Sequence, residues 1–342
     1  MRLAALALAA ALALSITPTI AVAAPSPYNI DTATFSSFTP PATAPLGVSP
    51  EVYFDAPTGT YYLITTSMPP TQYRSTDGLT WTPVGNQLPM GIDWSIVQEG
   101  QASYRLYFAE MTPTTPGAGP SAPCTPGSKY LRYATSSDLV NWTTQPGVLL
   151  GDVGCGVPHV MKTTAGNYFL YFNKQDSAFG HGVRVATSTD GLSWNELPGI
   201  LANESELVDP APIEMPDGTF IMIGSTTGGS NRYQELQILS STDAINWNLR
   251  AKPLYSLPGT SVLDPSVELI NGQMRVWFGY APGGIHDSSR IATGTVEFTE
   301  TATTPPPSKA KAKAGKKCTK KGEVSGKLIC KKKKGKLVWA RR

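Results

Sequence analysis

A seven-residue pattern, Ser-x-Asp-x-x-x-Trp, constrains the fold of this 342-residue chain more than any other feature. It occurs four times, with its tryptophans at positions 81, 142, 194 and 247, so that successive copies lie 61, 52 and 53 residues apart. Similarity at a near-constant period of this length indicates a repeat architecture. The repeated acids are expected to hold Asp-box-type turns by accepting backbone amide hydrogen bonds, and not to act in catalysis. They are Asp77, Asp138, Asp190 and Asp243.

A second element recurs with the same period. It reads SPEV at 49–52, DWSI at 93–96, VPHV at 157–160, DPAPI at 209–213 and DPSV at 264–267. Each copy is followed by a turn containing Gly and by a strand rich in aromatic residues. Five such units of four strands predict an all-β fold, a five-bladed β-propeller with four-stranded antiparallel blades. Because a closed ring leaves no open sheet edge, we expect the segment 34–38 to pair with the last blade.

The first 23 residues carry one charge, an apolar run and the small residues Ala21-Val22-Ala23. This pattern predicts a cleaved secretory signal peptide over 1–23 and hence an extracellular protein. No later apolar run is long enough to predict a transmembrane segment. We assign 24–300 to the propeller, which we expect to be a monomer.

Charge divides the remainder of the chain. From Lys309 onward there are fifteen Lys and Arg residues against one acid, whereas the preceding region, Arg2 aside, holds 12 basic and 24 acidic residues. We assign 301–315 to a Pro/Thr/Ala/Lys linker and 316–342 to a small basic tail, where two apolar stretches around a lysine run predict a β-hairpin. Its charge suits an anionic cell-wall polymer, with a merely solubilising role as the alternative. We expect no nucleic-acid partner, because the tail lacks interleaved aromatic residues.

The four cysteines fall into two pairs. Cys124 and Cys155 lie in the body, and Cys318 and Cys330 lie in the tail. In an exported protein this even count predicts the disulfides 124–155 and 318–330. Neither pair has the spacing of a zinc site.

Chemistry is expected where the first strand of each blade begins, because these strands line the channel of a propeller. We predict Asp93, Asp209 and Asp264 as candidate catalytic acids. Carboxylates beside an aromatic ring suit a sugar, since the acids hold hydroxyls while the ring stacks on the sugar face. The candidate substrate-binding residues are Ser49, Glu51, Trp94 and His159. The alternative is that the acids only hold turns.

The five units, the ATSSDLVNW-type turns and the x-Pro-x-Val strand starts resemble those of the five-bladed propeller glycosidases. These are arabinanases, β-xylosidases and arabinofuranosidases of the glycoside hydrolase family 43 type, with the invertase group more distant, and the resemblance covers roughly residues 45–298. It implies a general base in the first blade, a modulating Asp in the third and a Glu general acid in the fourth. The matching positions here hold Ser49, Val157 and either Val208 or Asp209.

The resemblance therefore leaves three functions open. The first is a secreted glycoside hydrolase that cleaves arabinose-, xylose- or fructose-containing oligo- or polysaccharides through relocated acids. The second is a non-catalytic carbohydrate-binding or cell-surface propeller that has lost the acids of the family. The third is a sialidase-like enzyme, although sialidases use six blades. We expect no cofactor, except that some relatives hold an axial cation through a last-blade histidine, which makes His286 the candidate ligand for a structural calcium ion.

Overall fold

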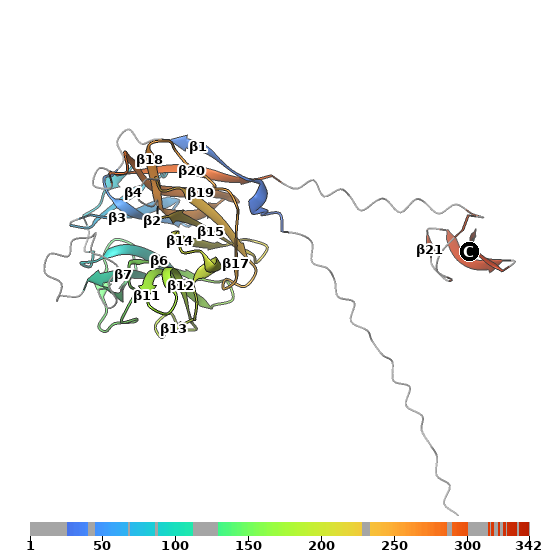
Figure 1. Ribbon diagram of the computed structural model, residues 1–342, viewed down its shortest axis with the longest axis horizontal. Coiled ribbons are helices and arrows are strands. Elements are labelled where there is room, and N and C mark those ends of the chain that lie inside the picture. Colours follow the sequence, from blue (N-terminus) through green and yellow to red (C-terminus); the bar gives the residue numbers. More distant parts are fainter. Residues whose placement is uncertain are drawn as a thin grey trace, which may run out of the picture.

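A computed structural model describes residues 26–39, 45–67, 69–85, 88–111, 129–227, 233–285 and 289–299 of the body. It also describes residues 314, 316–317, 321, 324–325, 327–333 and 335–341 of the C-terminal region. The body contains five antiparallel sheets of four strands each, arranged as a five-bladed β-propeller (Figure 1). The predicted fold class and blade number are confirmed. A ring of five blades contradicts the six-bladed sialidase-like alternative.

The blades follow one another along the chain. The first contains β2 (Val48–Asp55), β3 (Thr60–Thr66), β4 (Thr71–Ser75) and β5 (Thr82–Pro83). The second contains β6 (Ile92–Gly100), β7 (Ser103–Met111), β8 (Lys129–Ser136) and β9 (Thr143–Thr144). The third contains β10 (Gly156–Lys162), β11 (Tyr168–Asp176), β12 (Gly180–Ser188) and β13 (Asn195–Glu196). The fourth contains β14 (Leu207–Glu214), β15 (Phe220–Thr226), β16 (Leu236–Ser241) and β17 (Trp247–Leu249).

The fifth blade joins the two ends of the body. It contains β18 (Thr260–Ile270), β19 (Gln273–Pro282), β20 (Arg290–Phe298) and, as its outer strand, β1 (Ala33–Thr39). In the antiparallel register Phe35 lies opposite Val296, next to Gly294, where a Cβ atom would overlap the Phe35 ring. The predicted closing strand is therefore confirmed, and a glycine is required beneath its aromatic side chain.

The Ser-x-Asp turns have the structural role that their repetition predicts. In the third blade the Asp190 carboxylate accepts hydrogen bonds from the amides of Leu192 and Ser193, at 2.7 and 2.8 Å. The amide of Ser193, followed by that of Leu192, lowers the pKa of Asp190 to about 2. The carboxylate is thus committed to the turn as an acceptor, and the same pattern recurs around Asp77, Asp138 and Asp243.

The same turns also fasten each blade to the one before it. The carbonyl of the residue after the Asp accepts a side-chain hydrogen bond from the preceding blade. The four donor–acceptor pairs are Trp277 Nε1 to Gly78, Gln72 Nε2 to Leu139, Tyr107 hydroxyl to Gly191 and Tyr171 hydroxyl to Ala244. All four acceptor residues have a positive φ, between 61° and 69°. The turns therefore hold neighbouring blades together.

The tail forms a separate three-stranded sheet of β21 (Val324–Ser325), β22 (Leu328–Lys333) and β23 (Lys336–Arg341). The antiparallel pairing of β22 with β23 confirms the predicted hairpin, with Gly335 in its turn at a φ of +82°. Within the described parts of the chain the helical segments are the short 3-10 turns η1 (Ile30–Thr32) and η2 (Leu201–Asn203). No helix in those parts is long and apolar enough to cross a membrane.

Candidate functional site

The start of each first strand has the same unusual backbone conformation. One residue in each of β2, β6, β10, β14 and β18 is left-handed, with φ between 47° and 54°. These residues are Ser49, Asp93, Val157, Asp209 and Asp264, and we call them the axial ring. Each lies where the pairing with the second strand of its blade shifts register. This conformation is costly for any residue with a Cβ, and most costly for the β-branched Val157, so the ring depends on surrounding contacts.

Two of the axial acids connect their own blade to the next. The Asp93 carboxylate accepts a hydrogen bond from the amide of Val157 in the third blade at 3.1 Å. Its other oxygen accepts a hydrogen bond from the Thr66 hydroxyl at 3.4 Å. The Asp264 carboxyl accepts hydrogen bonds from both the amide and the hydroxyl of Ser49, at 3.1 and 3.2 Å. Ser49 therefore serves as a donor at the position where the resembling family has an acid.

Asp209 and Asp264 form a buried pair whose carboxyl groups hydrogen-bond to one another. Asp209 also accepts hydrogen bonds from Asn173 Nδ2 at 3.0 Å and from the Ser225 hydroxyl. Burial raises the pKa of both carboxyls, and the nearby charge of Asp209 raises the pKa of Asp264 well above its ordinary range. Since two such groups cannot both ionise easily, the protonated form of Asp264 is favoured, and its carboxyl can share that proton with Asp209.

The predicted substrate-binding residues lie near the same ring; Glu51 and Trp94 are buried, whereas Ser49 and His159 are partly exposed. Glu51 is 4% exposed and accepts a hydrogen bond from the Ile96 amide at 2.6 Å, and burial raises its pKa well above the usual range. Trp94 is also 4% exposed and packs 5.7 Å from the Phe108 ring in the core between the first two blades. Its burial leaves no ring face open for a sugar. Burial lowers the pKa of His159 to about 4, so this imidazole is neutral at pH 7.

The cavity enclosed by these residues is small. Ser49, Glu51, Asp93, Trp94, His159 and Asp264 line it together with Val157 and the neighbouring prolines, and its volume is about 20 Å³. That volume suits about one water molecule. The structure therefore brings most of the predicted residues together around the axis, but the cavity that they line is too small for a sugar ring.

Two further residues of this region, one partly exposed and one buried, were not predicted. Glu268 accepts a hydrogen bond from the Phe54 amide at 3.0 Å, and burial raises its pKa to about 8. Its place four residues after Asp264 on one face of β18 was a usable sequence signal. Lys129 is 3% exposed and donates to the carbonyl of Cys155. A Cβ atom on Gly156 would lie 2.8 Å from Asp93 Oδ2 and 3.3 Å from Lys129 Nζ, so this glycine makes room for both side chains.

Several predictions concern residues outside the described ranges. His286 is one of them, and no group of three or more His, Cys, Asp or Glu residues that could hold a metal occurs in the described ranges. Cys124 and Cys318 also lie outside, whereas Cys155 and Cys330 are described and neither is a free thiol. The two disulfide pairings and the calcium site remain predictions.

Comparison with known proteins supports the fold. No protein-family model and no curated protein matches the sequence. An exo-1,5-α-L-arabinanase from a bovine ruminal metagenomic library is similar in structure, with a TM-score of 0.56, 14% identity, and coverage of 76% of this chain and 96% of its own. A Cellvibrio cellulosa α-L-arabinanase complexed with arabinohexaose has a TM-score of 0.55 at 11% identity, covering 74% of this chain and 92% of its own.

A third solved structure, an endo-arabinase from Bacteroides thetaiotaomicron, has a TM-score of 0.55 and 14% identity, and covers 78% of this chain and 99% of its own. At such low identity the likeness shows the fold and not the reaction. The resemblance to five-bladed propeller glycosidases is therefore confirmed at the level of architecture.

Proposed function

We propose that this chain is an extracellular carbohydrate-binding propeller of glycosidase-like fold, in which the axial acids join the blades and do not cleave a glycosidic bond. One observation carries this proposal. Asp93, Asp209 and Asp264 each accept hydrogen bonds from neighbouring elements of the ring, and the cavity that Asp93 and Asp264 line has a volume of only about 20 Å³.

The chemistry of glycoside hydrolysis supports the same conclusion. The reaction requires a protonated carboxyl at the leaving oxygen and a second carboxylate facing the sugar or its attacking water. Both groups must be accessible to a bound sugar ring. Here Ser49 and Val157 stand at two of the family's acid positions, and the remaining acids are buried within the ring.

A hydrolase is the second candidate, and the Asp209–Asp264 pair favours it. A carboxyl that keeps its proton beside an ionised one is the division of labour that general acid–base catalysis uses. In that case Asp264 would protonate the leaving oxygen and Asp209 would act as the base or nucleophile. Such a reaction would require the axial cavity to open.

A direct experiment separates the two candidates. The purified full chain is incubated with arabinohexaose, xylohexaose and a fructan, and both saturable binding and release of reducing ends are measured for wild type, Asp264→Asn and Asp209→Asn. The proposal predicts binding without release in all three proteins. Release by wild type that is abolished by Asp264→Asn would establish the hydrolase. The absence of both binding and release in wild type would contradict a carbohydrate function.

The proposed location rests on two parts of the sequence. Residues 1–23 have the pattern of a secretory signal peptide. The tail hairpin exposes Lys331, Lys332, Lys333, Lys336 and Arg341, a density of positive charge that suits an anionic polymer of the cell wall. We propose that the tail retains the propeller at the cell surface while the propeller binds glycan.

A further inference from the structure

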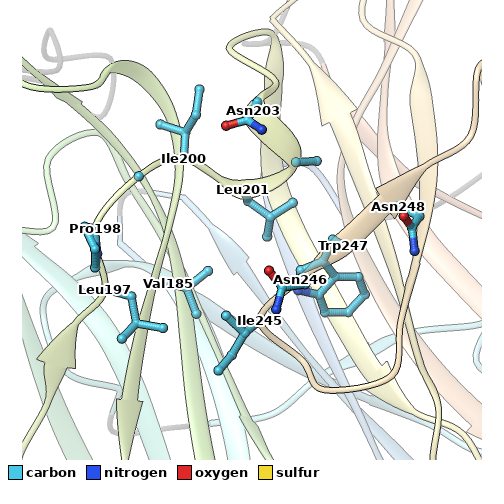
Figure 2. Close-up of a pocket in the computed structure, with 12 residues that line it drawn as sticks. Val185, Leu197, Pro198, Ile200, Leu201, Asn203, Ile245, Asn246, Trp247 and Asn248 are labelled. Atoms are coloured by element: carbon cyan, nitrogen blue, oxygen red, sulfur yellow. The ribbon is translucent and has the colours of Figure 1, made fainter.

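A second pocket, of about 360 Å³, lies between the third and fourth blades, and no residue of the axial ring lines it. Figure 2 shows its two walls, the Pro198–Asn203 segment on one side and the Ile245–Asn248 turn on the other. We infer that this pocket, here called the inter-blade pocket, binds a neutral saccharide unit. The inference rests on the proposed carbohydrate-binding function and assigns it a site.

The size and floor of the inter-blade pocket suit a small ligand. Its volume falls in the range of small-molecule sites, which combine an apolar lining with a few polar groups. Val185, Leu201 and Trp247 belong to one buried apolar cluster and form part of the lining. Ile245, 40% exposed, extends this apolar surface toward solvent. Because Val185, Leu201 and Trp247 are nearly buried, the apolar contact with the C–H face of a sugar ring would come mainly from Ile245.

The polar groups of the pocket are three carboxamides, Asn203, Asn246 and Asn248. A carboxamide both donates and accepts hydrogen bonds, as a sugar hydroxyl does. The Asn246 side chain is held in place, because its Nδ2 donates to Asp243 Oδ2 at 2.7 Å. That bond uses the amino group and leaves the orientation of the Asn246 carbonyl oxygen fixed. Asn203 and Asn248 are exposed to solvent at the pocket.

Charge selects a neutral ligand. None of the twelve residues that line the pocket has an ionisable side chain. An anionic ligand would therefore find no cation there, and the region before Lys309 is acidic, with 24 acidic against 12 basic residues apart from Arg2. A cationic ligand would find no carboxylate in the lining. Arabinose-, xylose- or glucose-type units fit this lining, whereas uronic acids do not.

The lining differs from the corresponding positions of the other blades. The residues on either side of the turn tryptophan are Thr80 and Thr82, Asn141 and Thr143, Ser193 and Asn195, and Asn246 and Asn248. Only the fourth copy has Asn on both sides. The turn itself explains the first Asn, because Asn141 Nδ2 makes the same bond to Asp138 at 2.8 Å. It does not explain Asn248.

The opposite wall is preformed. Ala202 and Asn203 are both left-handed, at φ values of 54° and 53°, and the turn is closed by the Glu204 amide, which donates to the Leu201 carbonyl at 3.1 Å. Leu201 anchors the turn in the core. A rigid backbone of this kind lowers the entropic cost of binding, because the position of the Asn203 Cβ atom is already fixed.

The test uses titration calorimetry of the full chain with arabinohexaose and xylohexaose, and with a galacturonate hexamer as the anionic control. The variants are Asn248→Ala and Asn203→Gly, since Gly keeps the left-handed backbone while removing the carboxamide. Asn195→Ala is the matched control. Asn195 is exposed, and it follows the turn tryptophan of the third blade as Asn248 follows that of the fourth. Each pocket variant is expected to raise Kd for the bound neutral hexamer about 5- to 10-fold, as the loss of one hydrogen bond implies.

The outcomes separate the site from the function. Weaker binding by both pocket variants, with Asn195→Ala unchanged, supports the inter-blade pocket. Binding that both variants retain at full strength overturns this site but leaves carbohydrate binding intact. Preferential binding of the galacturonate hexamer that both pocket variants weaken overturns the neutral ligand class, whereas binding that neither variant weakens is assigned to the basic tail. If wild type binds none of the hexamers, the proposed function fails together with the site.

Discussion

Asp264 in the last blade accepts two hydrogen bonds from Ser49 in the first, at 3.1 Å from the amide and 3.2 Å from the hydroxyl. This contact joins the two blades between which the ring closes. The contact also accounts for a serine at the position where the resembling glycosidases have an acid. A carboxylate there would lie against the Asp264 carboxyl without the hydroxyl hydrogen that Ser49 donates. The axial ring is therefore an assembly device of the propeller.

Replacement of Asp264 by Ala should destabilise the protein strongly. The change leaves the partly buried Ser49 amide without its acceptor, which costs about 1–3 kcal/mol in the free energy of unfolding. Asp264→Asn should cost less, because Asp264 is already protonated and an amide can still accept from Ser49 and donate to Asp209. Urea unfolding at pH 7 measures both. Equal losses for the two variants would contradict the protonated state.

Stability should depend on pH through Glu268. Its pKa rises from an ordinary 4.5 to about 8 on folding, so between these values the folded state binds a proton that the unfolded state has released. The contribution of Glu268 to stability is then full below pH 4.5 and falls as the pH rises toward 8. Glu268→Gln should reduce this slope in urea unfolding between pH 5 and 8, without removing it, because Glu51 and Asp264 also have raised pKa values. A slope unchanged in Glu268→Gln would refute this assignment.

The fastening of one blade to the next predicts a modest cost for a single hydroxyl. Tyr171→Phe removes the 2.6 Å hydrogen bond to the Ala244 carbonyl and should lower the free energy of unfolding by about 1 kcal/mol. Tyr233→Phe is the control, because Tyr233 is 41% exposed. Equal stability of the two variants would show that the carbonyl finds another donor.

The turn acids should matter for stability and not for ligand binding. Asp190→Ala removes the acceptor of two backbone amides and should lower the thermal midpoint, while the Kd for a bound glycan stays unchanged. Because the pKa of Asp190 is about 2, its contribution should persist as the pH falls to about 4 and disappear below that. Loss of glycan binding in a folded Asp190→Ala protein would assign this acid to a binding site.

The tail should bind anionic polymers through charge. Replacing Lys331, Lys332 and Lys333 together by Gln should move the elution of the full chain from phosphocellulose to lower salt, because three exposed cations are lost. Lys252→Gln, an exposed lysine of the body, should leave elution unchanged. Unchanged elution of the triple variant would leave the tail with no part in anion binding.

The fold could be predicted from the sequence because it depends on local, repeated signals. The four Ser-x-Asp turns revealed the repeat, the five recurring strand starts gave the blade number, and the need to leave no open sheet edge predicted that the segment 34–38 closes the ring. The axial contacts could not be predicted, because Asp264 and Ser49 are 215 residues apart and meet only through the angles between five blades. Trp94 illustrates the same limit, since its sequence position beside Asp93 gave no indication that its ring packs into the core. The inter-blade pocket depends on the left-handed turn at Ala202 and Asn203, and no residue pattern in the sequence predicts that turn.

One titration tests the central claim, that this propeller binds glycan without cleaving it. Aliquots of arabinohexaose, and separately xylohexaose, are injected into the full chain in a calorimeter. Binding alone predicts heat pulses that diminish to saturation and return to the original baseline after each injection. A baseline that stays displaced while substrate remains, and that Asp264→Asn restores, would show turnover and contradict the claim.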